Sequence, residues 1–108
     1  MATGLVIGGG PAGLMAAEAM ALAGLDVTVA EAKPSVGRKL LMAGKSGLNL
    51  TKAEPEAAFL AALEEAGPAL SPIIADFGPE AVQAWAQDLG QEVFTGTTGR
   101  VFPEAMKA

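Results

Sequence analysis

The chain is 108 residues long, enough for one small domain or for part of a larger protein. It contains no cysteine and no histidine, which excludes disulfides, thiol nucleophiles, imidazole bases and the usual soft metal sites. We therefore expect no metal centre. The formal net charge of −5 argues against a general nucleic-acid binder.

The charge is unevenly distributed along the chain. Residues 1–53 carry five cations against three anions, a net charge of +2. Residues 54–108 carry two cations against nine anions, a net charge of −7. The first part is therefore the part that we expect to attract an anionic ligand.

One apolar stretch, residues 4–25, contains a single charged residue, Glu18, and raises the question of a membrane span. Gly8-Gly9-Gly10-Pro11 would break a helix in this stretch, and no Lys or Arg precedes it as in a signal peptide. We therefore expect no membrane association and a cytoplasmic protein.

The first 30 residues predict a strand, a helix and a second strand. Leu5-Val6-Ile7 is a short apolar run before glycines, which is typical of a strand buried on both faces of a parallel sheet. Residues 12–23 are rich in strong helix formers, with Pro11 at the start and Gly24 after the end. Residues 27–30 predict the second strand, which completes one βαβ unit.

The turn from the first strand into the helix carries the pattern Gly8-x-Gly10-x-x-Gly13. Each glycine has a physical role in a phosphate-binding turn. Gly8 lets the chain leave the strand sharply, Gly10 lets the backbone approach a pyrophosphate, and Gly13 lets the helix pack close to the sheet. The start of the helix, at Pro11 and Ala12, offers a partial positive charge and free N–H groups to the phosphates.

An acidic residue, Glu31, ends the second predicted strand, and Ala32 follows it. A carboxylate at this position can accept hydrogen bonds from both hydroxyls of an adenosine ribose, and it would repel a 2′-phosphate. The nucleotide bound here should therefore not be NADP. The alternative is a glycine turn and a surface glutamate that bind no ligand.

The connection of residues 32–52 is rich in Gly and Lys and shows no sustained hydrophobic periodicity. Connections of this length are usually functional or disordered. Arg38 or Lys39 can neutralise a pyrophosphate, and Gly44-Lys45-Ser46-Gly47 can pass close to a cofactor ring. The alternative is a solvated basic loop, which we favour for each lysine taken alone. A P-loop is excluded, because Lys39 stands where the upstream glycine is required.

The rest of the chain predicts helices and a hairpin. The first helix ends at Gly67-Pro68, the second begins at Ser71-Pro72, and a third apolar stripe ends at Gly90. Residues 92–94 and 100–102 predict two short strands around a Gly/Thr-rich turn.

These elements predict an α/β fold, a Rossmann-like βαβ FAD/NAD(P)-binding fold followed by helices and a short β-hairpin. Residues 1–53 would form the dinucleotide-binding unit, and residues 54–108 the start of the remainder of a larger protein. No third parallel strand is recognisable after Ala30, so we expect the fold to be incomplete in this chain.

The residues from Gly8 to Gly13, Glu31 and Gly37-Arg38-Lys39 resemble the bacterial BaiN-like family of FAD-dependent oxidoreductases, also described as YhiN-like or aminoacetone oxidase-like. The resemblance continues through residues 44–51 and returns at residues 99–103. Family members are several times longer, and many carry Arg-Cys where this chain has Gly47-Leu48. The chain therefore resembles a divergent branch of the family.

The resemblance implies that FAD is the cofactor, with its ADP part bound by the glycine turn and Glu31. It places Arg38 and Lys39 near the pyrophosphate or flavin, and the loop from Gly44 to Asn49 near the isoalloxazine ring. Together, residues and resemblance give these candidate cofactor-binding residues: Gly8, Gly10, Pro11, Ala12, Gly13, Glu31, Ala32, Arg38, Lys39, Gly44, Ser46 and Asn49.

Three functions remain open from the sequence. The first is the FAD-binding part of an oxidoreductase whose flavin takes a hydride from NAD(P)H or from a small-molecule substrate. The second is an NAD-binding module, and the third is a non-catalytic remnant that associates through exposed sheet edges or with the remainder of the same polypeptide. No catalytic residue can be assigned.

Overall fold

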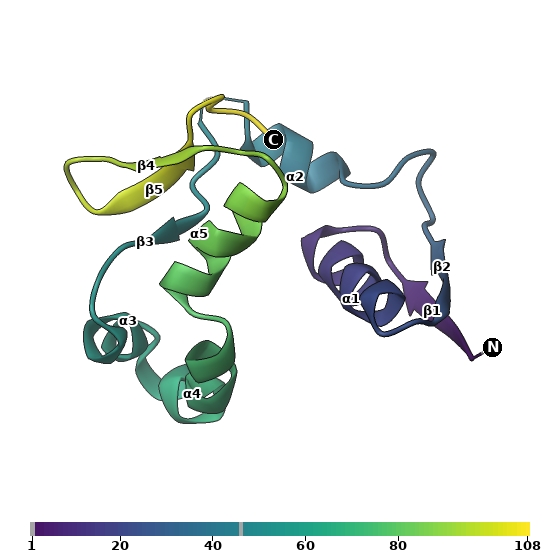
Figure 1. Cartoon of the computed structure of the whole chain (residues 1–108), viewed down its shortest axis with the longest axis horizontal. Helices are drawn as coiled ribbons and strands as arrows, with labels where there is room; N and C mark the ends of the chain where they lie inside the picture. The colour runs from purple at the N-terminus through teal and green to yellow at the C-terminus, as the bar shows by residue number, and fades with distance from the viewer. Residues whose placement is uncertain (1, 46) are drawn as a thin grey trace. The chain divides into compact units, whose positions relative to one another are not determined.

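A computed structural model of the chain describes residues 2–45 and 47–108. The chain forms two compact units (Figure 1). One holds the residues up to Ala43 together with Ala108, and the other holds the residues from Gly44 to Lys107.

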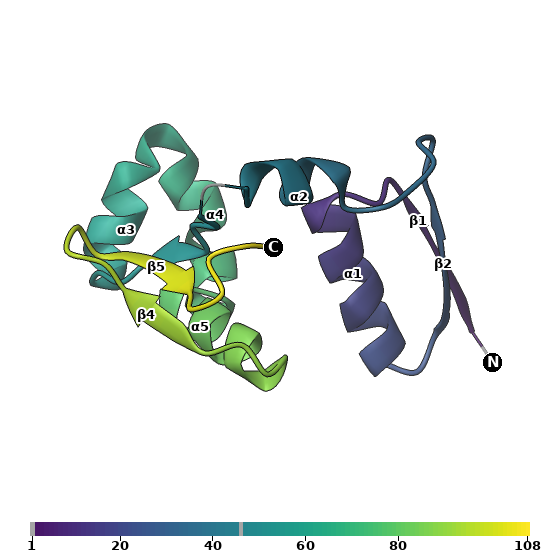
Figure 2. The same cartoon turned by 90° about the horizontal axis from the view of Figure 1, so that it is seen from above.

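The first unit contains the predicted βαβ motif. Strand β1 (Thr3–Ile7) is followed by helix α1 (Pro11–Leu22) and strand β2 (Asp26–Ala30). The two strands pair in parallel, with Thr3 opposite Asp26 and Ile7 opposite Ala30. Helix α1 contacts both strands and lies along one side of the pair (Figure 2). The predicted fold class is confirmed for this unit.

The prediction that β1 is buried on both faces is wrong for the described residues. Val6 is 8% exposed, whereas its neighbours Leu5 and Ile7 are 63% and 84% exposed. Successive side chains of a strand point to opposite faces, so Val6 lies on the covered face with α1 and its two neighbours lie on the other. Helix α1 covers one face only, and no described element covers the second.

The ends of α1 follow the sequence prediction. Pro11 occupies the first turn, where its missing N–H costs no hydrogen bond. Gly24, after the helix, has a φ of 93°, the left-handed conformation that favours glycine at a helix end. Its N–H donates to the Ala21 carbonyl oxygen at 3.0 Å.

The connection after β2 contains regular structure that the sequence analysis did not recognise. A short helix, α2 (Arg38–Ala43), lies in the first unit, and a two-residue strand, β3 (Thr51–Lys52), lies in the second. Strand β3 pairs with a distant strand, β5 (Arg100–Pro103). The break between the compact units therefore lies after Ala43, ten residues before the boundary proposed from the sequence.

The second unit begins its helical part with α3 (Glu56–Ala62), a 3₁₀ turn (Glu64–Ala66) and α4 (Gly67–Asp76), followed by α5 (Pro79–Asp88). The prediction that the second helix begins at Ser71-Pro72 is wrong. Pro68 already occupies the first turn of α4, so Pro72 lies inside the helix. A proline there lacks the N–H that would bond to residue 68.

The predicted hairpin is confirmed as β4 (Val93–Thr95) paired antiparallel with β5. With β3 it forms a sheet in the order β3-β5-β4. Val101, in the central strand, is fully buried. Phe94 lies opposite Phe102, and their ring centroids are 5.7 Å apart.

Among the described residues, no single helix is long and apolar enough to cross a membrane. The helical segments Glu56–Ala62 and Glu64–Asp76 meet the length and composition requirement only as a pair, which is bent by 119°.

Candidate functional site: the turn between β1 and α1

The site is built on the turn that joins β1 to α1. Gly8 has a φ of 102°, which a residue with a Cβ rarely adopts. Its N–H donates to the Ala30 carbonyl oxygen at 2.8 Å, so the pairing of the two strands continues one residue beyond β1. Gly10 then takes an extended conformation and precedes Pro11, the first residue of α1.

Gly13 brings the helix into contact with the end of the strand. A Cβ at this position would overlap the carbonyl oxygen of Gly8 and lie 3.2 Å from Cγ1 of Val6. Backbone cannot move away as a flexible side chain can, so only glycine fits here. The role in close helix packing that the sequence assigned to Gly13 is confirmed.

The first turn of α1 has unused hydrogen-bond donors. Leu14 N–H donates to the Gly10 carbonyl oxygen at 2.9 Å and starts the helical ladder. In the part of the chain that the structure describes, the N–H groups of Ala12 and Gly13 donate to no acceptor. A Cβ at Gly10 would meet nothing within 4 Å, and no acidic side chain lies in this first turn. This helix start therefore has both the donors and the space to receive an anionic group.

Glu31, directly after β2, is hydrogen-bonded to the backbone on both sides of its carboxylate. Oε1 accepts the N–H of Gly9 and Oε2 accepts the N–H of Lys33, each at 2.9 Å. The Lys33 and Gly9 bonds, in that order, lower the pKa of Glu31 below its ordinary value of 4.5 and outweigh the opposing effect of burial. The Ala32 N–H and the charge of Arg38 lower it further. The carboxylate is therefore charged at neutral pH.

These bonds refine the role predicted for the Glu31 carboxylate. Each of its oxygens already accepts one backbone N–H. A carboxylate has about four lone-pair sites in all, so acceptor capacity remains for a further donor such as a ribose hydroxyl. The two functions, holding the turn and binding a ligand, are compatible.

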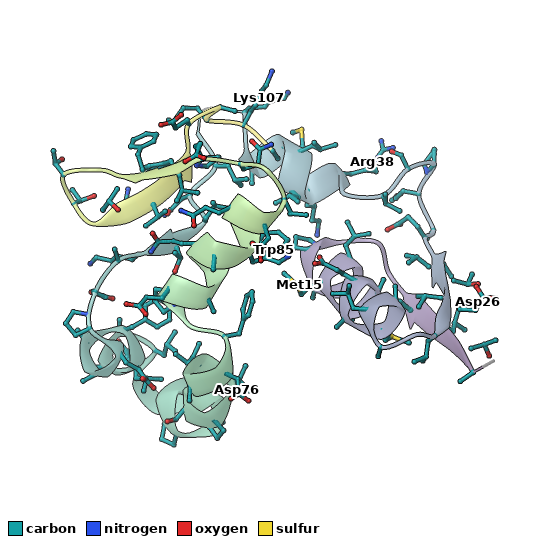
Figure 3. All side chains as sticks on the ribbon, viewed as in Figure 1. Met15, Asp26, Arg38, Asp76, Trp85 and Lys107 are labelled. Atoms are coloured by element: carbon teal, nitrogen blue, oxygen red, sulfur yellow. The ribbon has the colours of Figure 1, made fainter. Side chains whose placement is uncertain are left out.

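Arg38 (Figure 3) is the first residue of α2 and is exposed. Lys39, the next residue in the chain, is exposed as well. Nη1 of Arg38 donates to the hydroxyl oxygen of Ser35 at 3.1 Å. The positive charge of the guanidinium also lowers the pKa of Glu31.

The other predicted residues lie in the second unit or outside the described residues. Gly44 is buried and Asn49 is exposed, and both belong to the second unit. Ser46 lies outside the described residues. Cofactor contacts of these three residues stay predictions. The structure brings together Gly8, Gly10, Pro11, Ala12, Gly13, Glu31 and Ala32, with Arg38 near them.

Sequence reasoning missed two residues that fix the turn: Gly9 within it, and Gly37 just before α2. Gly9 donates to Glu31, and its carbonyl oxygen accepts the N–H of Gly37 at 2.7 Å. Gly37 has a φ of 70°. The pattern Gly8-x-Gly10-x-x-Gly13, the three-glycine fingerprint, treats position 9 as variable. The sequence features that could have pointed to these two residues are the three consecutive glycines and the single glycine six residues after Glu31.

The second unit has a different kind of surface. A cavity of about 370 Å³ lies among the segments 54–56, 74–76 and 78–81. Four acidic side chains line it: Glu54, Glu56, Asp76 and Glu80. Such a lining disfavours an anionic nucleotide. In the described residues no group of three or more acidic side chains could hold a metal ion.

Comparison with known families agrees with this geometry. The family model for the HI0933-like protein Rossmann domain matches residues 2–108. A comparison with curated proteins finds no match. The predicted Rossmann class is confirmed, and the family is an FAD-binding, oxidoreductase-related one that is akin to the BaiN-like proteins. The chain belongs to the family of HI0933-like Rossmann domains.

Proposed function

We propose that this chain binds the ADP half of FAD and forms the FAD-binding part of a flavoprotein oxidoreductase. The observation that carries the proposal is the start of α1. Two unused N–H groups, of Ala12 and Gly13, lie beside the open space at Gly10, and the charged Glu31 is bonded to the same turn. Membership of a family of FAD-binding Rossmann domains supports a nucleotide as the ligand of this turn.

The residues fit the ADP group. The N–H groups of Ala12 and Gly13 would bind the pyrophosphate, and Gly10 would allow it to approach the backbone. The free lone pairs of Glu31 would accept the ribose hydroxyls. A 2′-phosphate would meet a charged carboxylate there, so the site should discriminate against NADP.

Further residues would contact the rest of the cofactor. Arg38 and Lys39 would add positive charge near the pyrophosphate or flavin, and Gly44, Ser46 and Asn49 would lie near the isoalloxazine ring. The bound flavin would supply hydride transfer from NAD(P)H or a small-molecule substrate. The protein's own residues would bind the cofactor and orient it.

A second candidate is an NAD-binding module. The same turn and Glu31 would bind NAD, because NAD and FAD share an ADP half. A non-catalytic role, with association through exposed sheet edges or with the remainder of the same polypeptide, stays the third candidate. The net charge of −5 supports the proposal that the protein does not bind nucleic acid. A cytoplasmic localisation stays a prediction.

The test is the absorbance spectrum of the protein purified without added flavin, followed by titration with FAD, NAD⁺ and NADP⁺. We expect flavin bands at about 370 and about 450 nm, or uptake of added FAD. Glu31→Ala should weaken FAD binding, whereas the matched control Asp26→Asn, which removes an exposed carboxylate from β2, should not. A colourless protein that binds NAD⁺ and takes up no FAD would establish the second candidate instead.

A further inference from the structure

Gly9 is held at both of its backbone polar groups by one segment of the chain. Its N–H donates to Oε1 of Glu31 at 2.9 Å, and its carbonyl oxygen accepts the N–H of Gly37 at 2.7 Å. The segment between these two partners, residues 31–37, therefore closes over the turn. We refer to residues 31–37 as the clamp segment.

The clamp segment also occupies the space where a side chain of residue 9 would lie. Gly9 is buried, and a Cβ on it would lie 2.7 Å from Cγ1 of Val36, 3.0 Å from its Cβ and 3.2 Å from Oε1 of Glu31. A Cβ on the neighbouring Gly10, by contrast, would have no atom within 4 Å. The two adjacent glycines therefore differ: at Gly9 the protein itself leaves no room for a side chain, whereas the space beside Gly10 is open.

We infer that Gly9, which lies outside the three-glycine fingerprint, is a positioning residue. The clamp segment fixes its backbone and so sets the course of the turn before a ligand arrives. The inference rests on the proposed function, because the groups that are positioned in this way are the N–H donors of α1 and the carboxylate of Glu31. A site that is ordered in advance binds more tightly, since less ordering accompanies binding.

The first test is a suppressor experiment on FAD affinity. Gly9→Ala should weaken FAD binding by about tenfold to hundredfold, the range that corresponds to typical overpacking energies. Val36→Ala should change FAD binding little, because the two hydrogen bonds that hold Gly9 come from Glu31 and Gly37 and the Val36 residue is 47% exposed. The double variant Gly9→Ala/Val36→Ala should recover part of the affinity, since it removes Cγ1 of residue 36, the closest atom to the new methyl group, and keeps its Cβ.

A second readout needs no ligand. The carboxyl ¹³C signal of Glu31, followed by NMR against pH, reports whether the Gly9 N–H still donates to it. We expect Gly9→Ala to raise the pKa of Glu31 toward its ordinary value, and the double variant to lower it again. Gly10→Ala is the matched control, because its Cβ lies in open space and should leave this pKa unchanged.

The outcomes separate this inference from the proposed function. A wild type that binds no FAD overturns the proposed function, while the Glu31 pKa still tests the clamp. A wild type that binds FAD, with Gly9→Ala binding equally well and the pKa unmoved, overturns the inference alone. A double variant no better than Gly9→Ala also overturns it, because the contact with Val36 is then not the cause.

Discussion

The two units differ at the positions that matter most for each: glycine backbone at the turn of the first unit, and a fully buried side chain in the sheet of the second. At the turn after β1, Gly13 lies against the Gly8 carbonyl oxygen and Gly9 is bonded at both of its polar groups. In the second unit, Val101 is fully buried at the centre of a three-stranded sheet. The first unit is therefore sensitive to an added Cβ at Gly9 or Gly13, and the second to the loss of side-chain volume at Val101.

The units also differ in charge, in a way that the sequence division obscured. The first unit has three cations and three anions, a net charge of zero, and the second has four cations and nine anions, a net charge of −5. The excess of +2 over residues 1–53 depended on Lys45 and Lys52, which belong to the second unit. The proposed binding of an anion at the turn would thus depend on oriented N–H groups rather than on net charge.

The largest effect is expected at the contact between Gly13 and Gly8. Gly13→Ala should destabilise the first unit by about 3 kcal/mol, because the added Cβ meets a backbone oxygen that cannot rotate away. Hydrogen exchange should rise at β1 and β2 amides and stay unchanged in β4 and β5. Gly10→Ala is the control. Equal protection in Gly13→Ala and in the wild type would show that the close contact is not needed.

The second largest effect is expected in the other unit. Val101→Ala removes two methyl groups from a fully buried position and should lower the free energy of unfolding by about 2 kcal/mol. Fluorescence of Trp85 in α5 reports on this unit during urea unfolding. Leu89→Ala, at a position that is 57% exposed, is the control and should change the urea midpoint little. A larger loss in the control would contradict the burial pattern.

A smaller effect should depend on pH. The pKa of Glu31 is lowered in the folded chain, so its hydrogen bonds stabilise the fold above its ordinary value of 4.5. This contribution is lost as the pH falls through the lower, folded-state pKa. The urea midpoint of the wild type should therefore exceed that of Glu31→Gln at pH 7 and approach it as the pH falls through the folded-state pKa. If the difference between the two urea midpoints stays constant with pH, the stabilisation does not depend on the charge of Glu31.

The smallest effect is expected at the surface of the second unit. Nζ of Lys52 lies 3.5 Å from Oε2 of Glu54, with the lysine side chain 51% exposed. Lys52→Ala should cost about 0.5 kcal/mol at low salt and less at high salt, because exposed ion pairs are weak and screened. Urea unfolding at two ionic strengths measures this. A salt-independent loss would mean that the stem of Lys52 contributes through packing instead.

The local elements were predictable where short-range chemistry decides them. The Gly8 turn, the Pro11 start of α1 and the Gly24 end follow from backbone conformations that each residue type allows. The start of α4 was not predictable in this way, because Pro68 and Pro72 both fit a first helical turn. Which of the two prolines begins the helix depends on the turn before it. In that turn Gly67 packs closely against the preceding helix, because a Cβ on Gly67 would lie 3.0 Å from the Leu60 carbonyl oxygen.

The sequence by itself determined the βαβ unit, its glycine turn and the position of Glu31, because spacing along the chain and residue type suffice for these. Only the tertiary structure decided that Gly9 is bonded to Glu31 and Gly37, and that β3 pairs with β5. It also decided that one face of β1 stays exposed among the described residues. These contacts join residues that are distant in sequence, and a pattern that repeats every two or four residues carries no information about such partners.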